Sequence, residues 1–332
     1  MAERSWWARL RGRLRAWRGG PAPGRWHEGR AFAWRGLVGW RPWVFPRRRY
    51  RVYVPRGWSR DVRAPLVVLL HGCRQTAADL AAGTRIVRAA DDAGALLLMP
   101  DQKDAANPWR CWNWFDGCTA AGRGEAAIVA AIIRRTVRRC DADPDRVVAA
   151  GLSSGAALAA VLGVRYPSLV RGVFAHSGLA CGAAASPLTA ITVMRRGPDV
   201  DVAAIARAAR AAAAGDVEVP LVVVHGTADD VVARLNADAL ARQYLALNGV
   251  DVPPGAATTL PPPDAAVRDE AAPLRTVRTR AWRRGGRTLV RIVEVDDLAH
   301  AWSGGDPALP FHDGAPPDAT ALLVDWAVAG AR

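Results

Sequence analysis

The sequence has few cysteines and no long apolar run, and these two shortages exclude several kinds of protein. Five cysteines in 332 residues are too few for a disulfide scaffold, include no C-x-x-C pair and leave at least one thiol unpaired. The longest apolar stretches, residues 64–70 and 94–99, fall far short of the roughly 20 residues that span a bilayer. We therefore expect no transmembrane helix. With 51% hydrophobic residues, the chain is able to bury a full globular core.

Acidic residues are scarce only near the N-terminus. Residues 1–63 contain 17 Arg against three acidic residues, whereas residues 64–332 contain 28 basic and 28 acidic residues. The formal net charge of +14 therefore belongs to a Trp- and Arg-rich extension over residues 1–63, and one large domain is predicted over residues 64–332. Because the charge is not spread over that domain, a nucleic-acid partner is not favoured.

The extension carries eight of the 14 Trp residues and lacks the apolar core and cleavage site of a secretory signal peptide. Within it, residues 5–18 predict an amphipathic helix that docks on an anionic lipid or apolar polymer surface. Its apolar face is formed by Trp6, Trp7, Leu10, Leu14 and Trp17. Two other interpretations stay open: these side chains pack on the large domain, or the segment is a disordered arginine-rich tail.

From residue 64 onward, short apolar runs alternate with helical stretches, the pattern of an α/β fold with a mostly parallel central sheet flanked by helices. Buried strands are predicted over residues 66–70, 95–99, 147–150, 172–175 and 221–224. The clearest predicted helix covers residues 124–139.

Two later regions differ from this pattern. A hairpin is predicted over residues 276–282 and 288–295. Residues 183–215 and 248–273 lack the alternation and are predicted to be surface insertions near a functional site.

A G-x-S-x-G motif at residues 151–155 follows a predicted strand and precedes a helical run. This is the context of a nucleophile elbow, and it makes Ser153 a candidate nucleophile. Gly151 and Gly155 leave room where a sharp turn brings backbone close on both sides. A plain Gly/Ser turn is the alternative interpretation.

Two further candidates follow Ser153 in the chain order of α/β-hydrolases. A carboxylate, Asp229 or the adjacent Asp230, lies on the loop after a predicted strand, at the carboxyl edge of the sheet. His300 lies in a loop of small residues after the last predicted strand. They predict a triad in which the carboxylate orients the imidazole and the imidazole takes the serine proton. This chemistry requires no metal ion and no organic cofactor.

An acyl-transfer site also needs hydrogen-bond donors for the oxyanion. The H-G-C segment at residues 71–73 follows the strand predicted over residues 66–70, where this fold supplies one backbone N–H. We predict that the amides of Cys73 and Ser154 form the oxyanion hole. The alternative is that the H-G-C segment only ends the strand and gives room for a turn.

Five segments are informative together: H-G-C-R-Q-T at 71–76, C-W-N-W-F at 111–115, G-L-S-S-G at 151–155, H-G-T-A-D at 225–229 and H-A-W-S-G-G at 300–305. They strongly resemble the polyhydroxybutyrate (PHB) depolymerase family of esterases, over about Tyr50 to Trp326. The resemblance implies an α/β-hydrolase fold and hydrolysis of carboxylic esters, and it leaves the acyl and alcohol groups open. Ser154 departs from the usual pattern, and its hydroxyl is expected to add a polar atom beside the oxyanion.

The resemblance also bears on single residues. The family pattern has Asp, two residues and then Val, which Asp229 and Val232 match, so it implies Asp229 rather than Asp230 as the acid. Trp114 and Trp302 are candidates for the substrate-binding walls of an acyl pocket, with a plain core role as the alternative.

The resemblance leaves two questions open, the disulfide state of the cysteines and the cellular location of the protein. A disulfide between Cys73 and Cys111 is one expectation, because both lie in motif segments that meet at the site and family members are often exported. Five reduced thiols in a cytoplasmic enzyme are the other. Without a signal peptide, a cytoplasmic or granule-associated location is favoured, and the resemblance leaves export open.

The sequence as a whole predicts a serine esterase that hydrolyses PHB or its oligomers through an acyl-enzyme. Its expected partners are an ester or polyester substrate and, through residues 5–18, a polymer granule or an anionic membrane. The alternatives are an esterase of the feruloyl or acetyl-xylan type, a non-catalytic protein that binds polymer granules on a hydrolase fold, and a nucleic-acid binder that acts through the basic extension.

Overall fold

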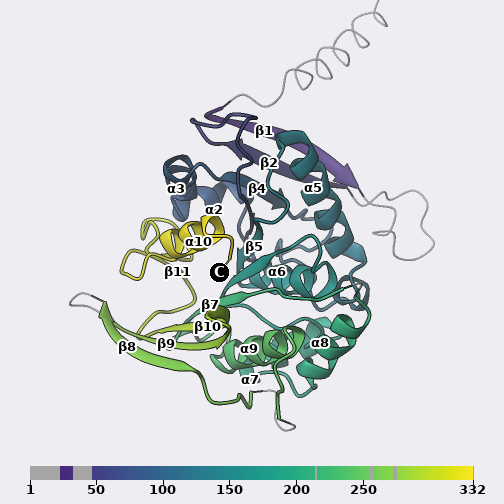
Figure 1. Ribbon diagram of the computed structural model, residues 1–332, viewed down its shortest axis with the longest axis vertical. Helices are drawn as coiled ribbons and strands as arrows, with labels where there is room; N and C mark the ends of the chain where they lie inside the picture. The colour runs from purple at the N-terminus through teal and green to yellow at the C-terminus, as the bar shows by residue number, and fades with distance from the viewer. Residues whose placement is uncertain (1–22, 33–46, 214, 254–257, 272–274, 332) are drawn as a thin grey trace, which may run out of the picture.

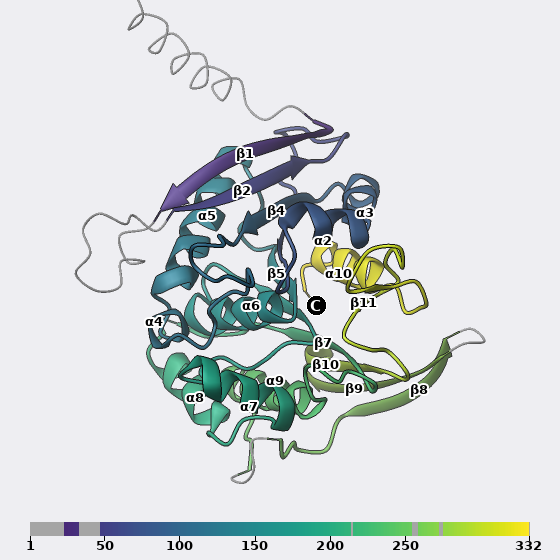
Figure 2. The ribbon, with the colours of Figure 1, turned by 180° about the vertical axis from the view of Figure 1, so that it is seen from behind.

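A ten-stranded sheet forms the centre of the molecule, and helices cover both of its faces (Figure 1, Figure 2). The computed structural model describes residues 23–32, 47–213, 215–253, 258–271 and 275–331. The spatial order of the strands is β1-β2-β4-β3-β5-β6-β7-β10-β9-β8. In chain order they are β1 (Arg25–Phe32), β2 (Arg47–Val54), β3 (Leu66–Leu70), β4 (Leu96–Asp101), β5 (Val147–Leu152), β6 (Gly172–His176), β7 (Leu221–Gly226), β8 (Ala265–Ala271), β9 (Arg275–Arg284) and β10 (Arg287–Val295).

The central strands run parallel, and antiparallel strands close both ends of the sheet. β3 pairs in parallel with β4 and β5, and the parallel series continues through β6 and β7 to β10. β2 joins β4 antiparallel and carries β1, while β9 and β8 extend the other end. The mostly parallel sheet predicted from the sequence is confirmed.

Alternate residues of the central strands belong to two apolar cores, one on each face of the sheet. In β3, Leu66 and Val68 belong to the first core and Val67 and Leu69 to the second, because successive side chains of a strand point to opposite faces. The first core is covered by α5 (Gly124–Cys140), α6 (Ser154–Arg165), α7 (Pro187–Arg196), α8 (Val202–Ala211) and α9 (Leu235–Leu247). The second is covered by α2 (Ala77–Gly83), α3 (Ile86–Ala93) and α10 (Ala319–Val328).

Short elements complete the fold. They are α4 (Gly117–Ala120) and a small parallel sheet of β11 (Trp302–Ser303) and β12 (His312–Asp313). No helix in the described ranges has the length and apolar character needed to cross a membrane.

The predicted strands and helix correspond to observed elements. The five predicted strands are β3 to β7, the predicted helix is α5, and the predicted hairpin is β9 and β10. β8 was not predicted: it lies within residues 248–273, taken for an insertion, and pairs with β9 at the edge of the sheet.

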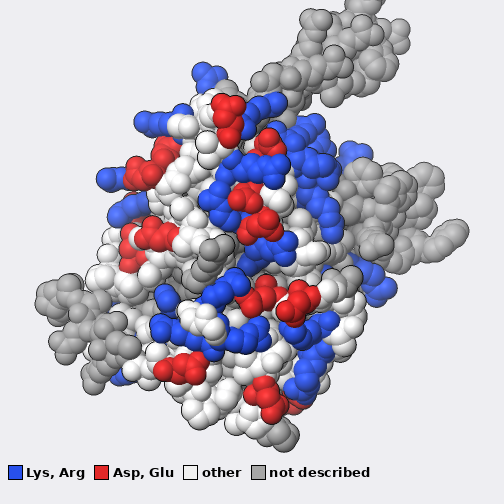
Figure 3. All heavy atoms as spheres, viewed as in Figure 1, with Lys and Arg blue, Asp and Glu red and all other residues white. Residues whose placement is uncertain are grey.

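The segment predicted as an N-terminal extension contributes two strands to the same sheet. β2 pairs with β4, and β1 pairs with β2, so the sheet begins before the boundary predicted at residue 64. Exposed Arg47 and Arg49 alternate along β2 with buried residues, and this obscures the strand in the sequence. Lys and Arg side chains are dense at the upper right, around these strands and α5, and others lie across the centre and lower half of the same face (Figure 3). The helix predicted over residues 5–18 lies outside the described residues.

Glu125 on α5 joins β2 to the loop that follows β4. Its carboxylate accepts hydrogen bonds from Arg48 Nη2 at 2.7 Å, Gln102 Nε2 at 2.6 Å, and the backbone N and Nδ2 of Asn113 at 2.8 and 3.0 Å. The side chains of Arg48 and Glu125 are only 5% and 8% exposed. Each charge is therefore buried and relies on the other.

Replacement of Glu125 by Ala should lower the free energy of unfolding by about 3–5 kcal/mol, because it leaves Arg48 buried without its counter-charge. Denaturant unfolding followed by circular dichroism measures the change. Glu28→Ala is the matched control: its ion pair with Arg51 is largely exposed, so its loss should change stability by less than about 1 kcal/mol. Equal losses in the two variants would contradict this role of Glu125.

Candidate active site

Ser153 lies at a sharp turn between β5 and α6. Its backbone φ of 56° and ψ of −120° are values that a residue with a side chain rarely adopts. A Cβ on Gly155 would lie 2.1 Å from the carbonyl oxygen of Leu70, and a Cβ on Gly151 would lie 2.4 Å from the carbonyl carbon of Gly155. The predicted strand-turn-helix context is present, and close backbone contact requires glycine on both sides of the serine.

Asp229 and His300 meet at the carboxyl ends of β7 and β10. His300 Nδ1 lies 2.8 Å from one carboxylate oxygen of Asp229 and 3.0 Å from the other. A carboxylate only accepts hydrogen bonds, so Nδ1 carries the proton and Nε2 of the neutral ring is left as an acceptor. Asp230 is exposed to solvent. The structure therefore brings Asp229, and not its neighbour, to His300.

The negative charge of Asp229 is supported from within its own turn. Its side chain is completely buried, and Oδ1 accepts hydrogen bonds from Val232 N at 2.8 Å and Val231 N at 3.1 Å. Burial alone raises the pKa of Asp229, but the hydrogen bond and charge of His300, together with the Val232 amide, outweigh burial and lower the pKa to about 2. At neutral pH Asp229 is therefore ionised and orients the imidazole.

Ser153 and His300 line one cavity of about 290 Å³. One wall is the segment of residues 72–75 that follows β3, and the apolar part of the lining is formed by Leu152, Met194, Val231 and Phe311. A small, mostly apolar hollow beside a serine and a histidine accommodates a short acyl chain.

The apolar lining was not predicted residue by residue. Met194, Val231 and Phe311 lie outside the recognised motifs, and tertiary packing brings them together. Met194 comes from α7, within residues 183–215, which the sequence predicts to be an insertion near a site. The loss of the strand-helix alternation over residues 183–215 is the sequence signal that indicated this part of the cavity lining.

Trp114 and Trp302, the predicted walls of an acyl pocket, do not line this cavity. Trp302 is fully buried, its Nε1 donates to Thr320 Oγ1 at 3.0 Å, and its ring stacks on His176 with centroids 5.2 Å apart. Trp114 is 3% exposed and meets the Phe115 ring edge-on. Both are core residues, which is the alternative that the sequence left open: Trp114 belongs to the first core and Trp302 to the second.

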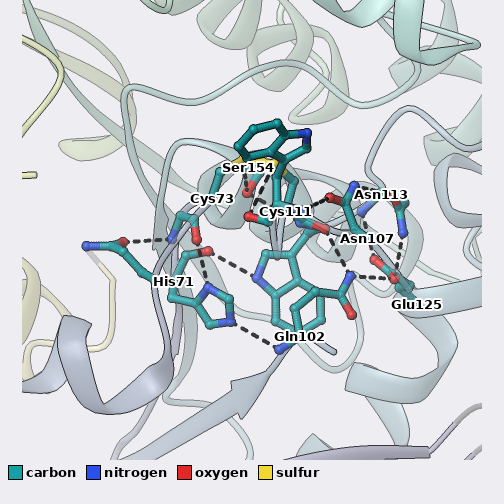
Figure 4. The surroundings of a disulfide bond; sticks show 12 residues. His71, Cys73, Gln102, Asn107, Cys111, Asn113, Glu125 and Ser154 are labelled. Atoms are coloured by element: carbon teal, nitrogen blue, oxygen red, sulfur yellow. Dashed lines mark hydrogen bonds between the residues drawn. A yellow bond between two sulfur atoms is a disulfide. The ribbon is translucent and has the colours of Figure 1, made fainter. Parts of the chain in front are cut away.

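A disulfide joins Cys73 to Cys111 beside the elbow (Figure 4). It ties the segment after β3 to the loop after β4, and a hydrogen bond from Arg74 N to Trp109 O at 2.7 Å joins the same two segments. The expected bridge is confirmed, and the cysteines outside it are Cys118, Cys140 and Cys181.

Both residues predicted to supply the oxyanion hole lie at this bridge, since Cys73 forms it and the side chain of Ser154 contacts Cys73. Cys73 lines the cavity, and Ser154 is the first residue of α6, where amides have no acceptor within the helix and the dipole favours negative charge. The Ser154 Oγ lies 3.5 Å from Cys73 Sγ and accepts a hydrogen bond from Trp112 N at 3.4 Å. These contacts link the first residue of α6 to both segments that the disulfide joins.

Three other histidines near this edge of the sheet are buried and neutral. Burial lowers the pKa of His176 to about 3, and it also lowers the pKa of His71 and of His225. None of the three lines the cavity, and the contact of His176 with Ser153 is through the backbone, where Ser153 N donates to the His176 carbonyl oxygen at 2.9 Å. Their side chains therefore support the loops around the site. Among the described residues, no cluster of His, Cys, Asp and Glu is arranged to hold a metal ion.

Unfolded, unreduced protein should show three reactive thiols, because Cys73 and Cys111 are bonded to each other. Titration with a chromogenic disulfide reagent in denaturant counts them, and the same assay after reduction should give five. Five thiols before reduction would contradict the bridge.

Comparison with known proteins gives a family match. The family model described as "Esterase PHB depolymerase" matches residues 48–260. Poly(3-hydroxyalkanoate) depolymerase C of Paucimonas lemoignei is 32% identical over 212 residues, which are 63% of this chain and 50% of that protein. Feruloyl esterase B of Neurospora crassa is 32% identical over 145 residues, 42% of this chain and 48% of that protein. The chain thus spans about half the length of these curated relatives.

Solved structures give the fold. Acetyl xylan esterase from Aspergillus awamori matches with a TM-score of 0.66 at 19% identity, over 83% of this chain and 94% of that chain. An S-formylglutathione hydrolase from Agrobacterium tumefaciens matches with a TM-score of 0.51 at 12% identity, over 93% and 96%. With the parallel sheet and its flanking helices, these matches show an α/β-hydrolase fold.

Proposed function

The chain belongs to the esterase PHB depolymerase family, and from this premise we propose that it is a serine esterase acting on poly(3-hydroxybutyrate) or its oligomers. The observation that carries the proposal is the contact of His300 Nδ1 with the buried Asp229 carboxylate, beside a cavity that His300 shares with Ser153. The relative named as a poly(3-hydroxyalkanoate) depolymerase supports the choice of substrate.

Acylation begins when Ser153 Oγ attacks the ester carbonyl carbon and His300 Nε2 takes the hydroxyl proton. The carbonyl oxygen becomes an oxyanion, which accepts hydrogen bonds from the amides of Cys73 and Ser154. Asp229 stabilises the imidazolium that forms. The bond to the alcohol oxygen then breaks, and His300 gives its proton to the leaving alcohol.

Deacylation repeats these steps with water as the nucleophile. His300 takes a proton from water, the hydroxide attacks the acyl carbon, and Ser153 leaves with the proton that His300 returns. The products are one alcohol and one carboxylic acid for each ester and water consumed. The residues of the chain supply every proton transfer in this scheme.

A feruloyl or acetylxylan ester is the second candidate substrate, and the names of two relatives favour it: feruloyl esterase B and, at 27% identity over 135 residues, acetylxylan esterase A of Emericella nidulans. The cavity of about 290 Å³ has room for a hydroxybutyryl, an acetyl or a feruloyl group, so its volume alone does not choose among them. Hydrolysis of PHB, hydroxybutyrate oligomers, acetylated xylan and methyl ferulate side by side decides between them.

The triad makes a sharp prediction for p-nitrophenyl butyrate. Ser153→Ala and His300→Ala should each lower kcat by at least about 10⁴-fold with the fold intact, because triad members act as one unit. Asp229→Asn should lower kcat by about 10³- to 10⁴-fold, because it removes the charge that orients the imidazole. The exposed neighbour gives the matched control, Asp230→Asn, which should stay near wild type. A crippled Asp230→Asn with a mild Asp229→Asn would refute the assignment, and an inactive wild-type chain would favour the non-catalytic granule-binding alternative.

We also propose that residues 5–18 dock the enzyme on a polymer granule or an anionic membrane. This proposal rests on the amphipathic pattern of their sequence alone. Removal of residues 1–18 should leave hydrolysis of a soluble ester unchanged and lower binding to PHB granules or to vesicles with anionic lipid. Co-sedimentation at low and high salt measures the binding. A truncated enzyme that binds both surfaces as before would rule out docking by this segment, and one that unfolds would place the segment in the core.

A further inference from the structure

A basic groove lies beside the cavity of Ser153 and His300, and the proposed mechanism does not use it. Its volume is about 680 Å³, more than twice that of the cavity. Residues of its wall include Arg30, Arg47, Arg49, Thr76, Lys103 and Arg110. Seven basic side chains line it against two acidic ones, so a ligand that enters it meets a positive field.

Three of these arginines come from the two strands at the edge of the sheet. Arg47 and Arg49 alternate along β2, both are exposed, and Arg30 of β1 lies opposite Arg49 in the register, so the three share one face. Because β2 runs antiparallel to β4 and Arg49 pairs with Asp101, they lie at the edge where the parallel strands end. Ser153 lies at that same edge.

Several of these charges are left uncompensated. Three cations are paired, Arg48 with Glu125, Arg51 with Glu28 and Arg110 with Asp104. Across the ranges that the structure describes, four others have no carboxylate at ion-pair distance: Arg30, Arg47, Arg49 and Lys103. The pKa of Lys103 is lowered, mainly by burial and in addition by the positive charges of the nearby arginines. An anion in the groove would relieve this repulsion.

The groove and the cavity have a common wall. Gln75 lines the cavity, and the next residue, Thr76, lines the groove. Arg74 also lines the cavity, with its guanidinium 4.6 Å from the centre of the Trp109 ring, and Arg110, which follows Trp109, lines the groove. Positively charged side chains therefore line both the cavity and the adjoining groove.

We propose that this groove binds the free carboxylate of an acid-ended oligoester while one of its ester bonds lies at Ser153. An oligomer of a hydroxy acid carries one such carboxylate, whereas the ester units of a long polymer are neutral. Unpaired arginine and lysine side chains are the natural partners of a carboxylate. This inference rests on the proposed function and narrows its substrate class to soluble, anionic oligomers.

The test compares the 3-hydroxybutyrate trimer as free acid with the same trimer capped as a neutral carboxamide. At low ionic strength, KM for the acid should be about tenfold lower than KM for the amide, with similar kcat. In 1 M salt, where charges are screened within about 3 Å, the two KM values should converge. Equal KM values at low salt would overturn the proposal.

The double variant Arg47→Gln/Arg49→Gln tests the groove itself, and its exposed sites should not affect folding. It should raise KM for the acid by about five- to tenfold, leaving kcat, KM for the amide and turnover of p-nitrophenyl butyrate unchanged. Arg60→Gln is the matched control: Arg60 is also exposed and lies beyond the other end of β2, so it should change nothing. Equal effects of the two variants would overturn the proposal.

Calorimetry with Ser153→Ala separates this inference from the proposed function, because it needs no turnover. Ser153→Ala should bind the acid trimer more tightly than the amide, and the added Arg47→Gln/Arg49→Gln changes should remove the difference. If the wild-type protein hydrolyses no ester, the proposed function is wrong, but the calorimetric comparison still tests whether the groove binds the carboxylate. Tighter binding of a short single-stranded oligonucleotide, lost in the same variant, would assign the groove to nucleic acid and overturn the proposal.

Discussion

Asp229 carries a negative charge that is kept out of water, and the proposed site depends on how that charge is held. An unsupported carboxylate in a fully buried position would take up a proton. The amides of Val231 and Val232 and the ring of His300 supply its donors. They do so because β7 and β10 are parallel neighbours, with Gly226 opposite Val295, and the loops that leave them lie side by side.

The same edge of the sheet collects the other groups of the site, because parallel strands present their carboxyl ends together. Ser153 follows β5, and Cys73 follows β3. The disulfide to Cys111 and the hydrogen bonds around Glu125 hold the loop after β4 against this edge (Figure 4). The proposed nucleophile, base and oxyanion donors therefore lie at strand ends and on loops that packed elements and the disulfide hold in place.

The features that the sequence predicted well are those in which local chemistry leaves few options. Strands buried on both faces read as continuous apolar runs, so β3 to β7 were predicted closely. β2 was not predicted, because exposed Arg47 and Arg49 interrupt its buried residues. The walls of the cavity were not predicted, because Met194 and Phe311 come from segments that are distant in the sequence. Trp302, which was expected in that wall, instead packs in the core against His176 and donates a hydrogen bond to Thr320.

Labelling with a fluorophosphonate, followed by peptide mass spectrometry, asks most directly whether His300 and Asp229 make Ser153 a nucleophile. Such a reagent forms a covalent bond only with an activated hydroxyl. We expect stoichiometric modification of Ser153 in the wild-type chain and a steep fall in its rate in His300→Ala. Modification at a different residue, or an unchanged rate in His300→Ala, would contradict the assignment.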